Sequence, residues 1–138
     1  MSLDREAFQE TLNDLLFNKD LPLTLNYAKS SAIVSESTPS AEMMQTSIGQ
    51  GKTQITPMHL NMITCAIAND GVLMKPYVID HVENDEGTVV KSFKASEYGR
   101  LMTEDESAIL KQLMTDVVEE GTASNLSDLI STAAGQTG

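Results

Sequence analysis

One short stretch of this chain contains the residue types that bind phosphate in nucleotide enzymes. Residues 47–57 read S-I-G-Q-G-K-T-Q-I-T-P, with the letters G-K-T at residues 51–53. A phosphate-binding loop needs another glycine five residues before the glycine of G-K-T, and Thr46 stands at that position. It also needs a helix that begins at the Lys-Thr step, so that backbone amides face the phosphate. Because the helix-start residues Thr56 and Pro57 come later, we expect this stretch to be a structural connection.

Two histidines and one cysteine are the other residues that could hold a metal or act as a nucleophile. His59 and Cys65 lie six residues apart on an expected helix and point to different faces, and His81 lies in an expected hairpin. No basic neighbour in the sequence favours a Cys65 thiolate. We therefore expect no metal site and no cofactor, a core thiol at Cys65, and imidazoles that are exposed or half-buried.

Two helices are expected in the first half of the chain. Residues 4–17 carry apolar side chains at helical spacing, and Asp4 is a candidate N-cap. Residues 58–69 form a second run, which begins after the N-cap candidate Thr56 and the helix-starting Pro57. This second run is apolar on nearly all sides, which is typical of a helix buried within a larger body.

A hairpin and a third helix are expected in the second half. Residues 76–82 and 88–93 are rich in β-forming side chains and flank a glycine-containing turn. Thr103 and Glu106 have the spacing of a capping box, and the apolar stripe that follows them stops at Gly121.

The remaining segments are expected to be less regular. Residues 18–45 contain two prolines and many hydroxyl side chains, and they read as a loop-rich crossing. Residues 122–130 could add one short helical turn, with Ser124 as its cap. The final residues, 131–138, resemble the entry into a strand.

Composition narrows the class of protein. The 138 residues carry a formal net charge of −11, which argues against a nucleic-acid-binding or anionic-membrane surface. No run approaches the ~18–20 apolar residues that a bilayer-spanning helix needs, and no signal peptide opens the chain. Composition and spacing alone therefore indicate a soluble α+β piece and no particular reaction.

A series of short motifs, in order, resembles the transpeptidase domain of penicillin-binding proteins. They are I-G-Q-G at 48–51, T-P at 56–57, A-I-A-N-D-G at 66–71, K-P-Y at 75–77, V-V-E-E-G-T-A at 117–123 and A-G-Q-T-G at 134–138. The resemblance implies an α+β fragment of the penicillin-binding/β-lactamase-like fold: mainly helices, with a β-hairpin and the start of the K-T-G strand. Residues 1–3 would be a cloning remnant, and residues 4–138 would be a C-terminal-half fragment of a class B transpeptidase domain.

The family's chemistry uses three motifs. A serine in S-x-x-K attacks the substrate carbonyl and forms an acyl-enzyme, S-x-N assists proton transfer, and the K-T-G strand lines the other wall of the cleft. This chain contains neither S-x-x-K nor S-x-N, which in family order precede Asp4. The resemblance therefore implies no catalytic residue in this chain, and it assigns substrate binding to Gln136, Thr137 and Gly138.

The resemblance also implies a function for the parent protein. It would be a D,D-transpeptidase, anchored in the cell membrane with its domain on the extracytoplasmic face, that acts on peptidoglycan stem peptides and is acylated by β-lactams. The fragment itself would be soluble, inactive and prone to self-association. Gln136 stands where the family has lysine, and it favours an alternative: a non-catalytic penicillin-recognising sensor or scaffold. An unrelated acidic interaction domain remains a third reading, so whether the parent is an enzyme stays open.

Overall fold

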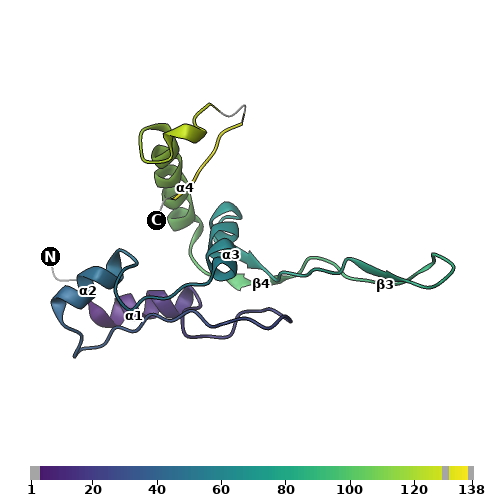
Figure 1. The fold of residues 1–138 in the computed structure, drawn as a ribbon, viewed down its shortest axis with the longest axis horizontal. Coiled ribbons are helices and arrows are strands. Elements are labelled where there is room, and N and C mark those ends of the chain that lie inside the picture. The colour runs from purple at the N-terminus through teal and green to yellow at the C-terminus, as the bar shows by residue number, and fades with distance from the viewer. Residues whose placement is uncertain (1–3, 129–130, 137–138) are drawn as a thin grey trace.

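A computed structural model describes residues 4–128 and 131–136. In chain order the elements are α1 (Arg5–Asp14), α2 (Ser40–Ser47), α3 (Pro57–Ala68), β1 (Val72–Met74), β2 (His81–Glu83), β3 (Val89–Ser92), β4 (Glu97–Arg100), α4 (Glu104–Glu119) and the 3-10 turn η1 (Ser124–Leu126). This mixture of helices and small antiparallel sheets confirms the α+β class. Figure 1 shows that α1 and α2, α4 with the terminal segment, and the β2–β3 hairpin extend in three directions from the region of α3 and β4.

The first helix begins where predicted and ends earlier. The carboxylate of Asp4 accepts hydrogen bonds from the backbone N–H groups of Glu6 and Ala7, so it caps α1. The helix stops at Asp14 because Leu16 adopts a positive φ of 69°. That reversal of the chain lets Leu16 enter one apolar cluster while Phe17 enters another.

The second helix, α2, was not predicted, because residues 18–45 read as a loop. Its buried residues are Met43 and Thr46. Met43 packs into a cluster with residues from α1 and the following loop. A helix this short is marginal by itself, so tertiary contact rather than local pattern accounts for it.

The third helix, α3, begins as predicted but is not enclosed as expected. Thr56 accepts the N–H of His59 through its side-chain oxygen, and Pro57 occupies the first turn. His59, Met62 and Ala66 are buried on one side. On another side of α3, Leu60 is 52% exposed, so the described residues cover only part of the helix.

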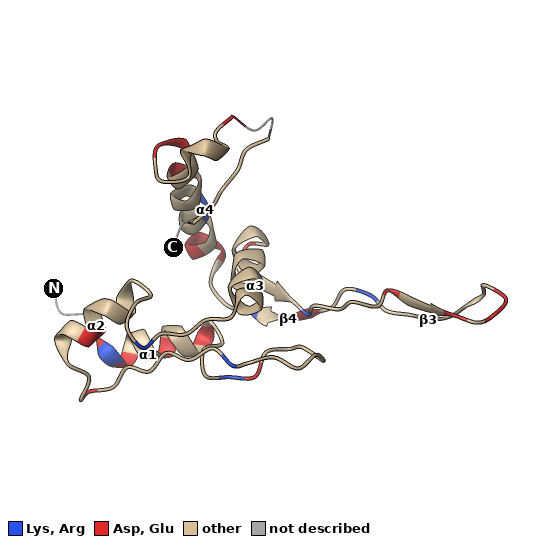
Figure 2. Ribbon diagram, in the orientation of Figure 1, with Lys and Arg blue, Asp and Glu red and all other residues tan. Residues whose placement is uncertain are grey.

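The predicted hairpin is present and belongs to a longer ribbon. Strands β2 and β3 pair antiparallel around a turn in which Asn84 accepts N–H groups of Glu86 and Thr88. Acidic residues gather at this turn (Figure 2). Strands β1 and β4, which were not predicted, pair antiparallel at the base of the ribbon. Strands of three and four residues are too short to show a reliable alternation in sequence.

Two apolar clusters form the core. The first joins the end of α1 to α3, β1 and the residue after β4; its buried members are Leu16, Leu21, Met62, Ala66, Leu73 and Leu101. The second joins α1, the following loop and α2; its buried members are Leu12, Phe17, Ala32, Val34 and Met43. None of the helices within the described ranges has the length and apolar character required to cross a bilayer.

The capping box predicted at the start of α4 is present. Thr103 and Glu106 exchange hydrogen bonds in both directions, and the helix ends at Glu119, close to the predicted stop at Gly121. The predicted short turn is present as η1, but Ser124 is its first residue and not its cap, because the N-cap position is taken by Ala123 and no side chain caps the turn. No strand is assigned within residues 131–136, so the predicted strand entry is not seen there.

Candidate functional site

Gln136 is the one residue of the predicted substrate-binding set that the structure describes. Thr137 and Gly138 lie outside the described residues. Gln136 is exposed at the end of an extended segment. The terminal segment runs back beside α4 in Figure 1, and the backbone N–H of Gly135 donates to the carbonyl oxygen of Met114 at 3.0 Å. α4 therefore fixes the position of Gln136 through the neighbouring residue.

The approach of Gly135 to α4 leaves room for ordinary packing. A Cβ at Gly135 would meet Cγ2 of Val118 at 3.7 Å, which is an ordinary van der Waals distance. Farther back, a cavity of about 250 Å³ separates α4 from the returning chain and is lined by both, including Val118, Glu119 and Thr132. The terminal segment thus contacts α4 at Gly135, whereas a cavity lies between α4 and the residues that precede Gly135.

The opening G-K-T stretch is a connection that leads into α3, as predicted, and it starts from the end of α2, which was not predicted. Lys52 forms an ion pair with Glu42 of α2 at 2.9 Å, so its ammonium is engaged within the chain. Gln54 and Ser31 exchange two backbone hydrogen bonds of 2.8 Å each. The next helix starts at Pro57 and not at the Lys-Thr step. The geometry of a phosphate-binding loop is absent from this part of the described chain.

His59 lies in the interior, which corrects the expectation of an exposed or half-buried imidazole. Its side chain is 1% exposed, and Nε2 lies 2.7 Å from the carbonyl oxygen of Leu15. A carbonyl oxygen can only accept, so Nε2 carries the proton and Nδ1, which is buried without a partner, does not. Burial lowers the pKa of His59 below its ordinary value of 6.5. This residue is a neutral structural imidazole.

Cys65 and His81 also lie apart from any shared site. Cys65 is exposed, so the prediction of a core thiol was wrong. Which face of α3 is buried depends on long-range packing that helical periodicity does not reveal. His81 begins β2, as predicted for the hairpin, and contacts Asp80 and Glu83. Among the described residues, no group of three or more His, Cys, Asp or Glu side chains is arranged to hold a metal.

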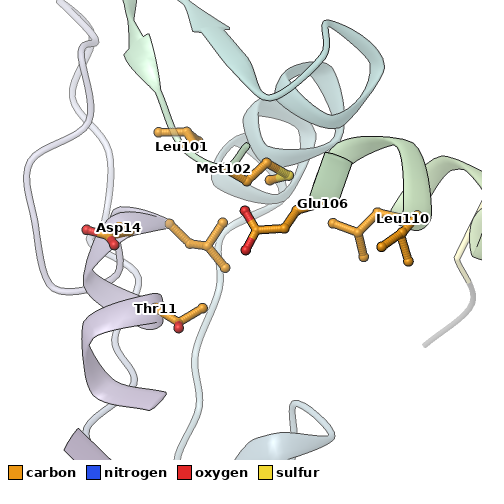
Figure 3. A pocket seen from close by; sticks show the side chains of 8 residues that line it. Thr11, Asp14, Leu101, Met102, Glu106 and Leu110 are labelled. Atoms are coloured by element: carbon orange, nitrogen blue, oxygen red, sulfur yellow. The ribbon is translucent and has the colours of Figure 1, made fainter. Parts of the chain in front are cut away.

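A larger cavity, of about 360 Å³, lies between α1 and α4. Figure 3 shows Thr11 and Asp14 on α1, Leu101 and Met102 after β4, and Glu106 and Leu110 on α4 around it. Glu106 is engaged in the capping box, and hydrogen bonds from the backbone and side chain of Thr103 lower its pKa. Thr11 donates to the carbonyl of Ala7. The Glu106 carboxylate and the Thr11 hydroxyl are thus both engaged in hydrogen bonds within their own segments.

The described residues also contain no activated serine. In the acyl-transfer chemistry described above, a serine hydroxyl must contact a lysine or a histidine. No hydrogen bond found within residues 4–128 and 131–136 joins a serine Oγ to either side chain. The most deeply buried serine, Ser107, instead donates to the carbonyl of Ile67. Ser107 therefore has a structural contact in this part of the chain.

Comparison with known proteins agrees with the motifs. The family model for the penicillin binding protein transpeptidase domain matches residues 2–138. The peptidoglycan D,D-transpeptidase MrdA of Acinetobacter baumannii is 28% identical over 97 residues, which span 70% of this chain and 14% of that protein. The chain thus matches only about a seventh of that curated relative's length.

Solved structures share the fold. The D,D-transpeptidase domain of a peptidoglycan glycosyltransferase from Eggerthella lenta has a TM-score of 0.77 at 24% identity, covering 99% of this chain and 36% of that one. Penicillin-binding protein A of Mycobacterium tuberculosis, solved as a penicillin G acyl-enzyme, has a TM-score of 0.75 at 23% identity, covering 84% of this chain and 26% of that one. Together with the family match over residues 2–138, these similarities lead to one conclusion: the chain belongs to the penicillin-binding protein transpeptidase domain family.

Proposed function

We propose that this chain forms one wall of the acyl-transfer cleft of a class B D,D-transpeptidase that cross-links peptidoglycan. The observation that carries the proposal is the family match over residues 2–138, which includes the A-G-Q-T-G motif at residues 134–138. Peptidoglycan stem peptides and the β-lactams that imitate them are the proposed ligands of the whole protein. It is proposed to be anchored in the cell membrane with this domain on the extracytoplasmic face.

The nucleophile is proposed to come from sequence that precedes Asp4 in family order. The chain has no S-x-x-K and no S-x-N, and no hydrogen bond found in its described part joins a serine hydroxyl to a lysine or histidine side chain. The 138-residue polypeptide by itself is therefore proposed to be inactive. Incubation with a fluorescent penicillin, followed by denaturing electrophoresis, should give no labelled band. A purified active transpeptidase in the neighbouring lane is the positive control, and covalent labelling of any serine in this chain would overturn the assignment.

Gln136 is proposed to contact the substrate carboxylate through a neutral hydrogen bond. A lysine in its place would give a charge-assisted bond of about 1.5–3 kcal/mol, against about 1 kcal/mol for a neutral one. In the longer protein, Gln136→Lys should therefore speed acylation by penicillin by roughly 2- to 30-fold. Gln136→Leu, which cannot form a hydrogen bond, is the control and should slow it. Equal rates for all three proteins would mean that residue 136 does not contact the carboxylate.

Gln136 also supports the second candidate, a penicillin-recognising sensor or scaffold without turnover. The two candidates differ in the sequence that encodes the region before Asp4. An intact S-x-x-K there favours the enzyme, and its loss favours the sensor. Reading the gene on both sides of this segment is the decisive observation.

Self-association of the isolated polypeptide is a further part of the proposal. Large apolar side chains are exposed on α3 and on the hairpin, with Leu60 at 52%, Val78 at 75% and Val90 at 61%. Exposed apolar surface of this kind favours association with a partner. Light scattering over a range of concentrations should give a mass that rises above the monomer, and a constant monomer mass would contradict the expectation.

A further inference from the structure

Four sulfur-containing side chains line one cavity beside α3. The cavity has a volume of about 300 Å³ and lies between α3, β1 and the residues that follow β1. The four are Met58, Met62, Cys65 and Met74. The whole chain has eight methionines and one cysteine, so its sulfur atoms are concentrated at this cavity.

Three of these residues share one face of α3. At 3.6 residues per turn, Met58, Met62 and Cys65 lie within an arc of about 60° around the helix axis. Along the axis they follow one another at intervals of about 6 Å and 4.5 Å. Met74 belongs to β1 and reaches the cavity from a different element. Residues of two different elements thus bring the four sulfur-containing side chains to the same cavity.

The accessibility of these residues differs from that of a packed core. Met58 is 43% exposed, Met74 is 39% exposed and Cys65 is exposed. Only Met62, at 3%, is buried and belongs to the first apolar cluster. Three of the four side chains can therefore be reached from solvent, and the fourth forms the inner wall.

The rest of the lining selects against hard cations. Among the residues that the structure describes, no carboxylate or imidazole lines the cavity, and Lys75 is its only charged residue. Mg²⁺ and Ca²⁺ prefer carboxylate and carbonyl oxygens, whereas thiolate and thioether sulfur select soft ions such as Cu(I). We propose that this sulfur cavity, defined by Met58, Met62, Cys65 and Met74, binds one monovalent soft metal cation of the Cu(I) class.

Binding at this site is an exchange of ions without electron transfer. The Cys65 thiol loses its proton to the solvent as the bond between the metal and the sulfur forms, and the methionine thioethers add neutral donors.

The test is a competition titration of the 138-residue chain. Cu(I), kept reduced with ascorbate under nitrogen, is titrated against the chromophoric chelator bicinchoninate in the presence of the protein. We expect one equivalent to be withheld from the chelator and a sulfur-only first shell in the X-ray absorption spectrum. Ag(I) should compete for the site, and Zn²⁺ should not.

Variants distinguish a site formed by the four sulfur-containing residues from binding by the Cys65 thiol alone. Changing an outer-sphere residue typically weakens metal binding 10- to 100-fold, so loss of a ligand in Cys65→Ala or in Met58→Leu/Met62→Leu should cost at least about tenfold. Met44→Leu is the matched control, because Met44 is 69% exposed on α2 and does not line the cavity. Circular dichroism verifies that each variant is folded. The single variant Met58→Leu is made as well, because it changes an exposed residue and leaves the buried Met62 in place.

Three outcomes would overturn the proposal. They are the absence of binding by the unmodified chain, an unchanged affinity in the methionine double variant, and an equal loss in Met44→Leu. The second outcome would identify an ordinary thiol, and the third would identify non-specific methionine binding. None of these outcomes bears on the transpeptidase assignment, which is tested by acylation.

Discussion

The imidazole of His59 and the carbonyl oxygen of Leu15 are joined by a hydrogen bond of 2.7 Å. It connects the first turn of α3 to the residue that follows α1. The ring of Phe17 lies beside the imidazole, with 5.1 Å between the ring centroids. A buried, neutral imidazole therefore holds the two helices together, and its protonation would place a charge at Nδ1, which has no partner.

We expect acid to destabilise the fold through His59. Burial lowers the pKa of this residue in the folded state, while the unfolded chain keeps the ordinary value of 6.5. The unfolded state then binds more protons than the folded state. The free energy of unfolding should therefore fall as the pH drops below 6.5, and this fall should end once the pH is below the folded-state pKa of His59. Urea unfolding between pH 8 and pH 4.5 measures this slope.

His59→Gln is the matched variant for that experiment. Its side-chain amide can still donate to Leu15, but it does not titrate in this range. The variant should lose the part of the acid slope that begins near 6.5. An unchanged slope would show that His59 is not the group responsible.

His81 should have the opposite pH dependence. Nδ1 lies 3.0 Å from Asp80 and Nε2 lies 3.0 Å from Glu83. Hydrogen bonds to Asp80 and then to Glu83 raise the pKa of His81 above 6.5, so its stabilising effect is fully present below 6.5 and is lost as the pH rises through the folded-state value. Because the chain has only two histidines, an NMR titration should give one pKa below 6.5 and one above it. Asp80→Asn should lower only the higher pKa, and a shift of both would contradict the separation of the two sites.

The parts of the fold that the sequence predicted are those formed by interactions between residues close together in the chain. The N-cap at Thr56, the capping box at Thr103 and the hairpin turn at Asn84 each satisfy backbone groups of their own segment. The helix α2 and the pairing of β1 with β4 depend on partners elsewhere in the chain. A local pattern cannot report such contacts, and both elements were missed.

The same distinction applies to the candidate site. The order of the short motifs identified the family and located Gln136, because these motifs are written in consecutive residues. Helical periodicity placed His59 and Cys65 on different faces of α3 but could not say which face is buried. The structure reverses the expectation, with His59 inside and Cys65 outside.

Gly71 should tolerate no side chain. It adopts φ +85°, and a Cβ there would lie 2.1 Å from the backbone oxygen of Met102. Gly87, in the hairpin turn, has φ +76°, and a Cβ there would have no neighbouring atom within 4 Å, so it is the control for backbone conformation alone. Gly87→Ala should cost about 1–2 kcal/mol, as expected for a non-glycine residue in the left-handed region. Gly71→Ala should cost clearly more in thermal or urea unfolding, and equal costs would mean that the contact with Met102 relaxes freely.

Ser107 should be the most sensitive serine in the chain, because it completes the end of another helix. Its side chain is 0% exposed, and Oγ donates to the carbonyl oxygen of Ile67 at 2.6 Å. Ile67 lies in the last turn of α3, where carbonyl groups lack partners within the helix, so Ser107→Ala leaves a partly buried acceptor unsatisfied. We expect a loss of about 1–3 kcal/mol in the free energy of unfolding, together with faster hydrogen exchange in α4. Ser127→Ala, which removes an exposed bond to Ser124, should change neither measurement. Equal effects of the two variants would mean that α4 is held against α3 by apolar contact alone.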